Sequence, residues 1–328
     1  MSNSLSQLRF WKTFFTPNHY SHDQIPNLTG KVAIVTGANT GLGYCTTVAL
    51  AAHGAHVFMA YRSQQRATDA IERAKAEIKE KYPQAADPKL DFLELDLNDM
   101  RKARDAAKKF LAKDLPLHIL VCNSGIMASL FELSADGIET QFAINHMGHF
   151  VFTMGLLDRI KKSQPSRIVI VSSNCHELTV PGAIDFDTLN DETKTDSIQR
   201  YARSKLANIL FTKALARRLE NERVYVNAVH PGYVFTDLSR GVGASSGAIL
   251  KQVVGVTNIV VAVKPEVGCL TQLYAAMSTE IEEDDIRGRY FIPIANEILP
   301  SEYARDEELQ EKLWTFSEKL VNEKIGGL

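Results

Sequence analysis

A tyrosine and a lysine four residues apart, Tyr201 and Lys205 in the stretch YARSK, are the residues best suited to proton transfer. On a helix this spacing places both side chains on one face, one turn apart. A phenol is a poor acid at neutral pH, with an unperturbed pKa of about 10. An ammonium group beside it stabilises the phenolate and lowers that pKa, so the pair could exchange a proton with a carbonyl or alcohol oxygen. The same spacing is also common on exposed helices, so the rest of the chain must support this chemistry.

A glycine-rich turn gives the second chemical signal. The apolar run KVAIVTG (31–37) is typical of a parallel strand that is buried on both faces, and a helical pattern follows Gly43. Gly37, Gly41 and Gly43 allow a tight turn and let the backbone approach a phosphate closely. The N-terminus of the following helix offers free N–H groups to a pyrophosphate. This context indicates a dinucleotide site, although the spacing is G-x-x-x-G-x-G rather than G-x-G-x-x-G.

The elements that position these groups alternate between strand and helix patterns, which predicts parallel βαβ units. We expect one α/β domain with a Rossmann-type, doubly wound, mostly parallel sheet. Seven strands are predicted, at 31–37, 56–62, 90–97, 118–125, 167–173, 224–232 and 291–293. Helices are predicted after Gly43 and at about 64–81, 100–113 and 137–162, and a further helix carries Tyr201 and runs to about Leu219.

Ligands of such a sheet bind beyond the carboxyl ends of its strands. Polar residues or glycines fall at most of these predicted ends: Gly37, Arg62, Asp96, Asn123, Ser173, Pro231 and Gly232. This coincidence favours a nucleotide site more strongly than any single motif does.

Composition excludes several other classes of protein. The chain has 328 residues, 45% hydrophobic and 23% charged, as expected for an ordinary globule with a sizeable core. Its net charge of −2 indicates no broad basic surface for nucleic acid. The four cysteines lack metal-ligand spacing, and no metal is expected. Because no signal peptide or spanning segment is recognised, we expect a cytoplasmic protein with reduced thiols.

Two segments stand apart from this pattern. Residues 1–28 form an N-terminal arm in which Leu8, Trp11, Phe14 and Phe15 recur at helical spacing. One hypothesis is an amphipathic helix whose residues 8–15 contact a membrane or lipid droplet peripherally. The alternative is an arm that packs against its own domain or a partly disordered tail. Within the domain (29–328), residues 237–263 are Gly/Ser-rich and then apolar, which predicts a substrate-side loop.

In the order of its motifs, the chain resembles the short-chain dehydrogenase/reductase family over about residues 28–294. Within the family it is most similar to the retinol-dehydrogenase-like and fungal carbonyl-reductase-like group. The motifs are TGANTGLG (36–43), LDL (95–97), CNSG (122–125), NHMGHF (145–150), VSS (171–173), YARSKLAN (201–208) and HPGYVFT (230–236).

The resemblance implies a role for each of four catalytic residues. Tyr201 would be the general acid in reduction and the general base in oxidation. Lys205 would lower the pKa of Tyr201 and hold the nicotinamide ribose. Ser173 would hydrogen-bond the substrate oxygen, and Asn145 would hold a water that relays protons to Lys205.

The resemblance also implies an NADP(H) site. Asp96 would contact the adenine, Asn123 would lie beside the adenosine ribose, and Thr236 would hold the nicotinamide amide. The full expected set is Gly37, Asn39, Thr40, Gly41, Leu42, Gly43, Arg62, Asp96, Leu97, Asn123, Gly125, Tyr201, Lys205, Pro231, Gly232, Val234 and Thr236.

The choice of NADP over NAD follows from the end of the second strand. A carboxylate there would bind both ribose hydroxyls and mark NAD, but no acidic residue occurs from His56 to Thr68. Arg62 and Ser63 stand there instead, and a guanidinium can bind a 2′-phosphate through two parallel hydrogen bonds.

Two departures from the family pattern are visible. Cys122 stands where the family usually has the first Asn of Asn-Asn-Ala-Gly, which should weaken hydrogen bonding at that strand end. A long polar insertion, 176–197, precedes the helix that many relatives use to dimerise, so both a monomer and a homodimer stay open.

The function expected from these residues is an alcohol dehydrogenase or carbonyl reductase with a small lipophilic substrate. A dinucleotide-bound sensor or scaffold without turnover is the alternative, although such proteins typically lack the Tyr or the Lys. A sugar-nucleotide epimerase is the third interpretation, but it would need a larger C-terminal substrate domain than residues 237–328 can form. The histidines His146, His149 and His176 are expected to be packed or hydrogen-bonded rather than metal ligands.

Overall fold

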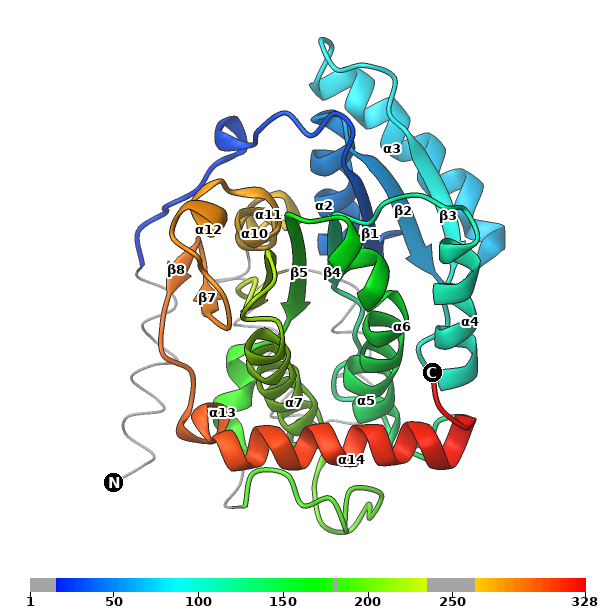
Figure 1. Cartoon of the computed structure of the whole chain (residues 1–328), viewed down its shortest axis with the longest axis vertical. Coiled ribbons are helices and arrows are strands. Elements are labelled where there is room, and N and C mark those ends of the chain that lie inside the picture. Colours follow the sequence, from blue (N-terminus) through cyan, green and yellow to red (C-terminus); the bar gives the residue numbers. More distant parts are fainter. Residues whose placement is uncertain (1–15, 180–181, 235–262) are drawn as a thin grey trace, which may run out of the picture.

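An eight-stranded sheet with the order β3-β2-β1-β4-β5-β6-β7-β8 organises the computed structural model, which describes residues 16–179, 182–234 and 263–328 (Figure 1). Strands β1 to β7 are parallel to their neighbours, and β8 pairs with β7 antiparallel. The strands are β1 (Val32–Thr36), β2 (His56–Tyr61), β3 (Leu90–Glu94), β4 (Ile119–Cys122), β5 (Ser166–Val171), β6 (Val224–Val229), β7 (Tyr290–Ile292) and β8 (Asn296–Glu297).

Helices cover both faces of the sheet (Figure 1). The longer helices are α2 (Gly41–Ala52), α3 (Ala67–Lys81), α4 (Met100–Leu111), α6 (Gly148–Lys162), α7 (Ser197–Arg218), α11 (Leu270–Met277) and α14 (Glu307–Ile325). The short ones are α5 (Thr140–Phe142), α10 (Pro265–Gly268), α12 (Glu280–Glu283) and α13 (Glu302–Arg305).

The alternation of side chains along the strands divides the core into two layers. In β1, Ile34 packs with the layer of α4, α6 and α7, whereas Ala33 and Val35 pack with the layer of α2, α3 and α11. All five residues of β1 are buried, which explains why the strand appears as a continuous apolar run. The chain order reverses between β1 and β4, and this switch point is where a doubly wound sheet opens a crevice for ligands.

The structure confirms the doubly wound, mostly parallel sheet and adds β8 to the seven predicted strands. The predicted helix 137–162 is wrong at its start, because α5 begins only at Thr140. Gly137 adopts a φ of +72° in the turn before it, a conformation that ends helical geometry. A π-helical turn, η3 (Ala143–Met147), then interrupts the helix before α6.

Two predicted segments lie largely or wholly outside the described residues: the stripe at 8–15 and the substrate loop at 237–263. The rest of the arm packs on the domain. Tyr20 is buried with its ring 5.5 Å from that of Tyr274, and Asn296 donates a hydrogen bond to the Pro17 carbonyl. In the described part of the chain, no helix is long and apolar enough to cross a bilayer.

Helix α14, which sequence patterns did not predict, packs against both α7 and α4 (Figure 1). Its Trp314 is 7% exposed and lies 5.4 Å from the Phe150 ring and 6.0 Å from the Phe211 ring. The Arg218 guanidinium covers the indole at 3.9 Å, a cation–π contact. The last helix therefore completes the layer formed by α6 and α7.

Replacing Trp314 by Ala should lower the free energy of unfolding by about 3 kcal/mol, because a large buried ring leaves a cavity among aromatic neighbours. Urea denaturation would measure the loss. Lys319→Ala on the same helix is the control, since its side chain is 68% exposed and should change stability by less than about 0.5 kcal/mol. Equal stability of both variants would show that α14 contributes little to the core.

Candidate active site

A cavity of about 540 Å³ opens at the carboxyl ends of the strands, at the predicted switch point. It brings together residues that lie up to about 200 positions apart in the chain. The predicted site residues that line it are Gly37, Asn39, Thr40, Leu42, Arg62, Asp96, Leu97, Asn123, Gly125, Ser173, Tyr201, Lys205, Pro231, Gly232 and Val234. Thr236 lies outside the described residues.

The glycine-rich turn brings the backbone close to this cavity. Gly37 has a φ of +65°, which a residue with a side chain rarely adopts. A Cβ on Gly43 would lie 2.4 Å from the Gly37 carbonyl oxygen, so only glycine fits under the turn. Helix α2 begins at Gly41 and directs its N-terminus toward the turn, the arrangement that binds pyrophosphates. Gly41 and Gly43 thus shape the turn, although neither lines the cavity.

Thr36, at the end of β1, joins this turn to the end of β4. Its hydroxyl oxygen accepts hydrogen bonds from the backbone N–H groups of Asn123 and Ser124, both at 2.9 Å. The side chain of Asn123 donates to the Thr36 carbonyl at 2.8 Å and accepts from Gln272 at 3.2 Å. These bonds fix the strand end that lines the cavity, even though Cys122 replaces the usual Asn. The Cys122 thiol lies 3.5 Å from the Thr153 hydroxyl and is buried.

Tyr201, Lys205 and Ser173 meet at one end of the cavity, and each is at most 7% exposed. Helix α7 carries the first two, as the four-residue spacing predicted. Lys205 Nζ lies 5.7 Å from the centre of the Tyr201 ring and donates to the Val171 carbonyl at 3.0 Å. Ser172 is a structural neighbour, as expected, because its hydroxyl is bonded to the Lys205 carbonyl at 2.7 Å.

Burial governs the ionisation of this pair. It raises the pKa of Tyr201 well above 10, with the nearby Cys175 thiol adding to the rise and Ser173 opposing it. Burial also lowers the pKa of Lys205 to about 8. The direction of the shift in the pKa of Tyr201 is opposite to the one expected from the sequence, because removing the phenolate from water disfavours the charged form. Tyr201 is thus a protonated phenol at neutral pH, a donor suited to the reduction of a carbonyl.

Asn145 lies behind the cavity in the π-helical turn and does not line it. Its side chain accepts from the Ile126 N–H at 2.9 Å and donates to the Ser204 hydroxyl at 2.9 Å. Ser204 in turn donates to the Tyr201 carbonyl at 2.7 Å. A Cβ on Gly125 would lie 3.1 Å from Asn145 Oδ1 and 3.4 Å from Lys205 Nζ, so this turn runs against both residues.

The opposite end of the cavity carries Arg62 and Asp96. Arg62 is exposed and forms no hydrogen bond or ion pair within the described ranges, so its guanidinium is available to a ligand. Asp96 accepts from the Asn98 N–H at 3.1 Å and lies 3.2 Å from Lys102 Nζ. Arg73 secures the glycine turn by donating to the Asn39 carbonyl at 3.1 Å.

Several lining residues were not identified from the sequence. Ile126, Met127, Cys175 and Tyr233 line the cavity, and only Tyr233 falls within a recognised motif. The predicted packing of the three histidines is confirmed. His146 lies 3.0 Å from the Ser317 hydroxyl, and His176 lies 2.7 Å from the Ser173 carbonyl. Among the described residues, no cluster of three or more His, Cys, Asp or Glu side chains could hold a metal ion.

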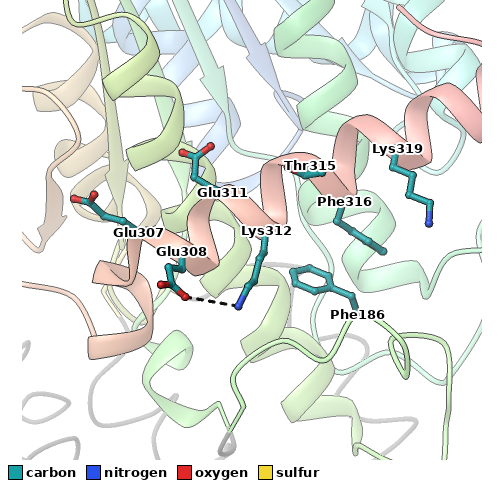
Figure 2. Close-up of a pocket in the computed structure, with 8 residues that line it drawn as sticks. All are labelled: Phe186, Glu307, Glu308, Glu311, Lys312, Thr315, Phe316 and Lys319. Carbon is teal, nitrogen blue, oxygen red and sulfur yellow. Dashed lines mark ion pairs between the residues drawn. The ribbon is translucent and has the colours of Figure 1, made fainter.

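A second hollow, on the surface of α14, has a different character (Figure 2). Its floor is the Phe186–Phe316 pair, whose ring centres are 4.6 Å apart. Two of its acidic residues are paired: Glu308 lies 3.9 Å from Lys312, and Glu311 lies 2.7 Å from Arg217. The described residues that line it include no buried acid or base and no glycine, so the cavity at the strand ends is the candidate active site.

Comparisons with known proteins agree with this geometry. A family model described as short chain dehydrogenase matches residues 31–186 and 190–246. Retinol dehydrogenase 14 of Homo sapiens is 39% identical over 299 residues, covering 89% of this chain and 86% of that protein. Short-chain dehydrogenase TIC 32 A, chloroplastic, of Brassica napus is 39% identical over 296 residues, covering 88% of each chain. A crystal structure of a putative uncharacterized protein from Mycobacterium Paratuberculosis superposes with a TM-score of 0.71 at 28% identity, covering 92% of this chain and 97% of that one.

The pKa of Lys205 predicts a pH limit. With that pKa at about 8, the ammonium loses its proton as pH rises through 8, so kcat/KM for a nicotinamide cofactor, which reports ionisations of the free enzyme, should fall over the same range. Lys205→Arg is the comparison variant, because a guanidinium stays charged over this pH range. Its pH profile should lack this fall in kcat/KM, even if the variant turns over more slowly than the wild type. A flat wild-type profile between pH 7 and 9.5, or an unchanged fall in the Arg variant, would contradict the assignment.

Proposed function

This chain belongs to the short-chain dehydrogenase family of oxidoreductases, and from that premise we propose that it transfers hydride between NADP(H) and a lipophilic carbonyl or alcohol. One observation carries the proposal. One cavity has the buried residues Ser173, Tyr201 and Lys205 at one end. At the other end is Arg62, which forms no hydrogen bond or ion pair with the part of the chain that the structure describes. The glycine turn between these ends lets a pyrophosphate approach the backbone.

In this mechanism the nicotinamide, when bound, supplies or accepts the hydride. Ser173 donates a hydrogen bond to the substrate oxygen and orients it toward Tyr201. Tyr201 gives its phenolic proton to that oxygen during reduction and takes a proton back during oxidation. Lys205 holds the nicotinamide ribose and stabilises the phenolate that forms. Asn145 supports the relay that returns a proton to Lys205.

The cavity also supports a lipophilic substrate. Ile126, Met127, Ile144 and Val234 contribute apolar side chains to its lining. Two relatives carry the name retinol dehydrogenase, 14 and 13, which is consistent with an apolar alcohol or aldehyde. A silent sensor or scaffold is the weaker proposal, because Ser173, Tyr201 and Lys205, the residues to which we assign the chemistry, all line the cavity.

Tyr201→Phe should keep NADPH binding and lower turnover of a carbonyl substrate by two or more orders of magnitude. The ring packing survives, but the proton donor is lost, and general acid–base catalysis is worth about 10²–10⁴-fold. A spectrophotometric screen of aldehydes and ketones with NADPH would first find a substrate. Turnover of a well-folded Phe variant at the wild-type rate would remove Tyr201 from the mechanism.

Arg62→Asp should raise the Michaelis constant for NADPH at least tenfold and change that for NADH little or favourably. Charged hydrogen bonds to a 2′-phosphate are worth roughly 1.5–3 kcal/mol each. The matched control is Lys79→Asp on α3, which makes the same change of charge at an exposed position outside the cavity. Equal kcat/KM values of the unmodified protein for NADH and NADPH would already contradict the predicted preference for NADP.

A further inference from the structure

His149, in the first turn of α6, lies between the end of β1 and the π-helical turn. It is 2% exposed. Its Nε2 is 2.9 Å from the Thr36 hydroxyl oxygen, and its Nδ1 is 3.1 Å from the Asn145 carbonyl oxygen. One ring therefore spans two segments that sequence places more than a hundred residues apart.

Hydrogen-bond chemistry assigns the tautomer of this ring. A carbonyl oxygen can only accept, so Nδ1 carries the hydrogen and donates to Asn145. Burial lowers the pKa of His149 to about 4, with the Lys205 charge contributing, so the ring is neutral at working pH and Nε2 is an acceptor. The Thr36 hydroxyl must then donate its hydrogen to Nε2.

This assignment completes a directed chain of hydrogen bonds. Because the hydrogen of Thr36 points at His149, its oxygen lone pairs face the N–H groups of Asn123 and Ser124, both at 2.9 Å. Removal of the Nε2 acceptor would free the hydroxyl to rotate away from these two amides. Removal of the Nδ1 donor would leave the Asn145 carbonyl without this bond inside a π-helical turn.

We propose that His149 is a positioning residue of the active site, which couples the strand end under the dinucleotide to the turn that holds Asn145. The proposal rests on the dehydrogenase function proposed above. His149 does not line the cavity. It acts through Thr36 on Asn123 and Ser124, and through Asn145 on Ser204 and α7.

Two substitutions separate the two bonds. His149→Asn can keep a donor near the Nδ1 position but cannot reach Thr36, so the dissociation constant for NADPH should rise about three- to tenfold while kcat changes little. His149→Gln can reach Thr36 with its amide but loses the short donor, so kcat should fall about three- to tenfold with NADPH affinity retained. His149→Phe keeps the ring and loses both bonds, so both quantities should change.

His53 provides the matched control. Its Nδ1 lies 2.7 Å from the carbonyl oxygen of Ala49, the residue four positions earlier, at the end of α2 and away from the cavity. His53→Asn and His53→Gln should leave the NADPH dissociation constant and kcat unchanged. A loss of melting temperature with unchanged kcat and affinity in all three His149 variants would overturn the proposal, because a purely structural histidine would behave in that way.

Nitrogen NMR of the unmodified protein tests the assignment without any variant. The His149 ring should be neutral with its hydrogen on Nδ1 between pH 6 and 8, and an Nε2–H tautomer or an imidazolium would overturn the proposal.

NADPH titration and turnover of the wild-type protein distinguish a failure of the dehydrogenase function from a failure of the role proposed for His149. Absent NADPH binding would refute the dehydrogenase function itself, whereas normal wild-type activity with unaffected variants would refute only the role of His149.

Discussion

A lysine ammonium held out of water without a carboxylate is the constraint on which this site depends. Lys205 is 3% exposed, and no ion pair of its own is found within the described residues; the Val171 carbonyl accepts its hydrogen bond instead. Removing a cation from water disfavours its charged form, which explains the lowered pKa of Lys205. The lowered pKa makes the proton of Lys205 easier to release, which suits the proton relay proposed for this residue.

Hydrogen bonds around Lys205 hold helix α7 in place without neutralising the charge of the ammonium. Ser172 bonds the backbone of Lys205, Ser204 bonds that of Tyr201, and Asn208 shares the Val171 carbonyl. All these partners are neutral, so none of them offsets the charge of Lys205. A carboxylate in their place would have raised the pKa of the lysine again. Burial and the Lys205 charge also keep the ring of His149 neutral, because a charged imidazole beside Lys205 would be repelled.

Sequence patterns predicted the sheet and most of the cavity because both depend on local signals. The apolar run of β1, the glycines after it and the four-residue spacing of Tyr201 and Lys205 each determine geometry within a few positions. The features that these patterns did not predict depend on contacts between residues that are far apart in the sequence. Helix α14 has no motif and is fixed by packing against α6 and α7. The bond between His149 and Thr36 and the burial that raises the pKa of Tyr201 likewise arise only after folding.

The position of α14 also determines when, during synthesis of the chain, this part of the core can form. The Lys324 carbonyl accepts a hydrogen bond from Arg101, and the Ile325 and Gly327 carbonyls accept from Arg104. The Trp314 ring contacts those of Phe150 and Phe211. A ribosome adds about 5–20 residues per second, so on the order of five to twenty seconds separate the synthesis of Phe211 from that of Trp314. Through that interval Phe150 and Phe211 lack their contact with the indole of Trp314. Synthesis from the N-terminus therefore completes this part of the core only when α14 has been made.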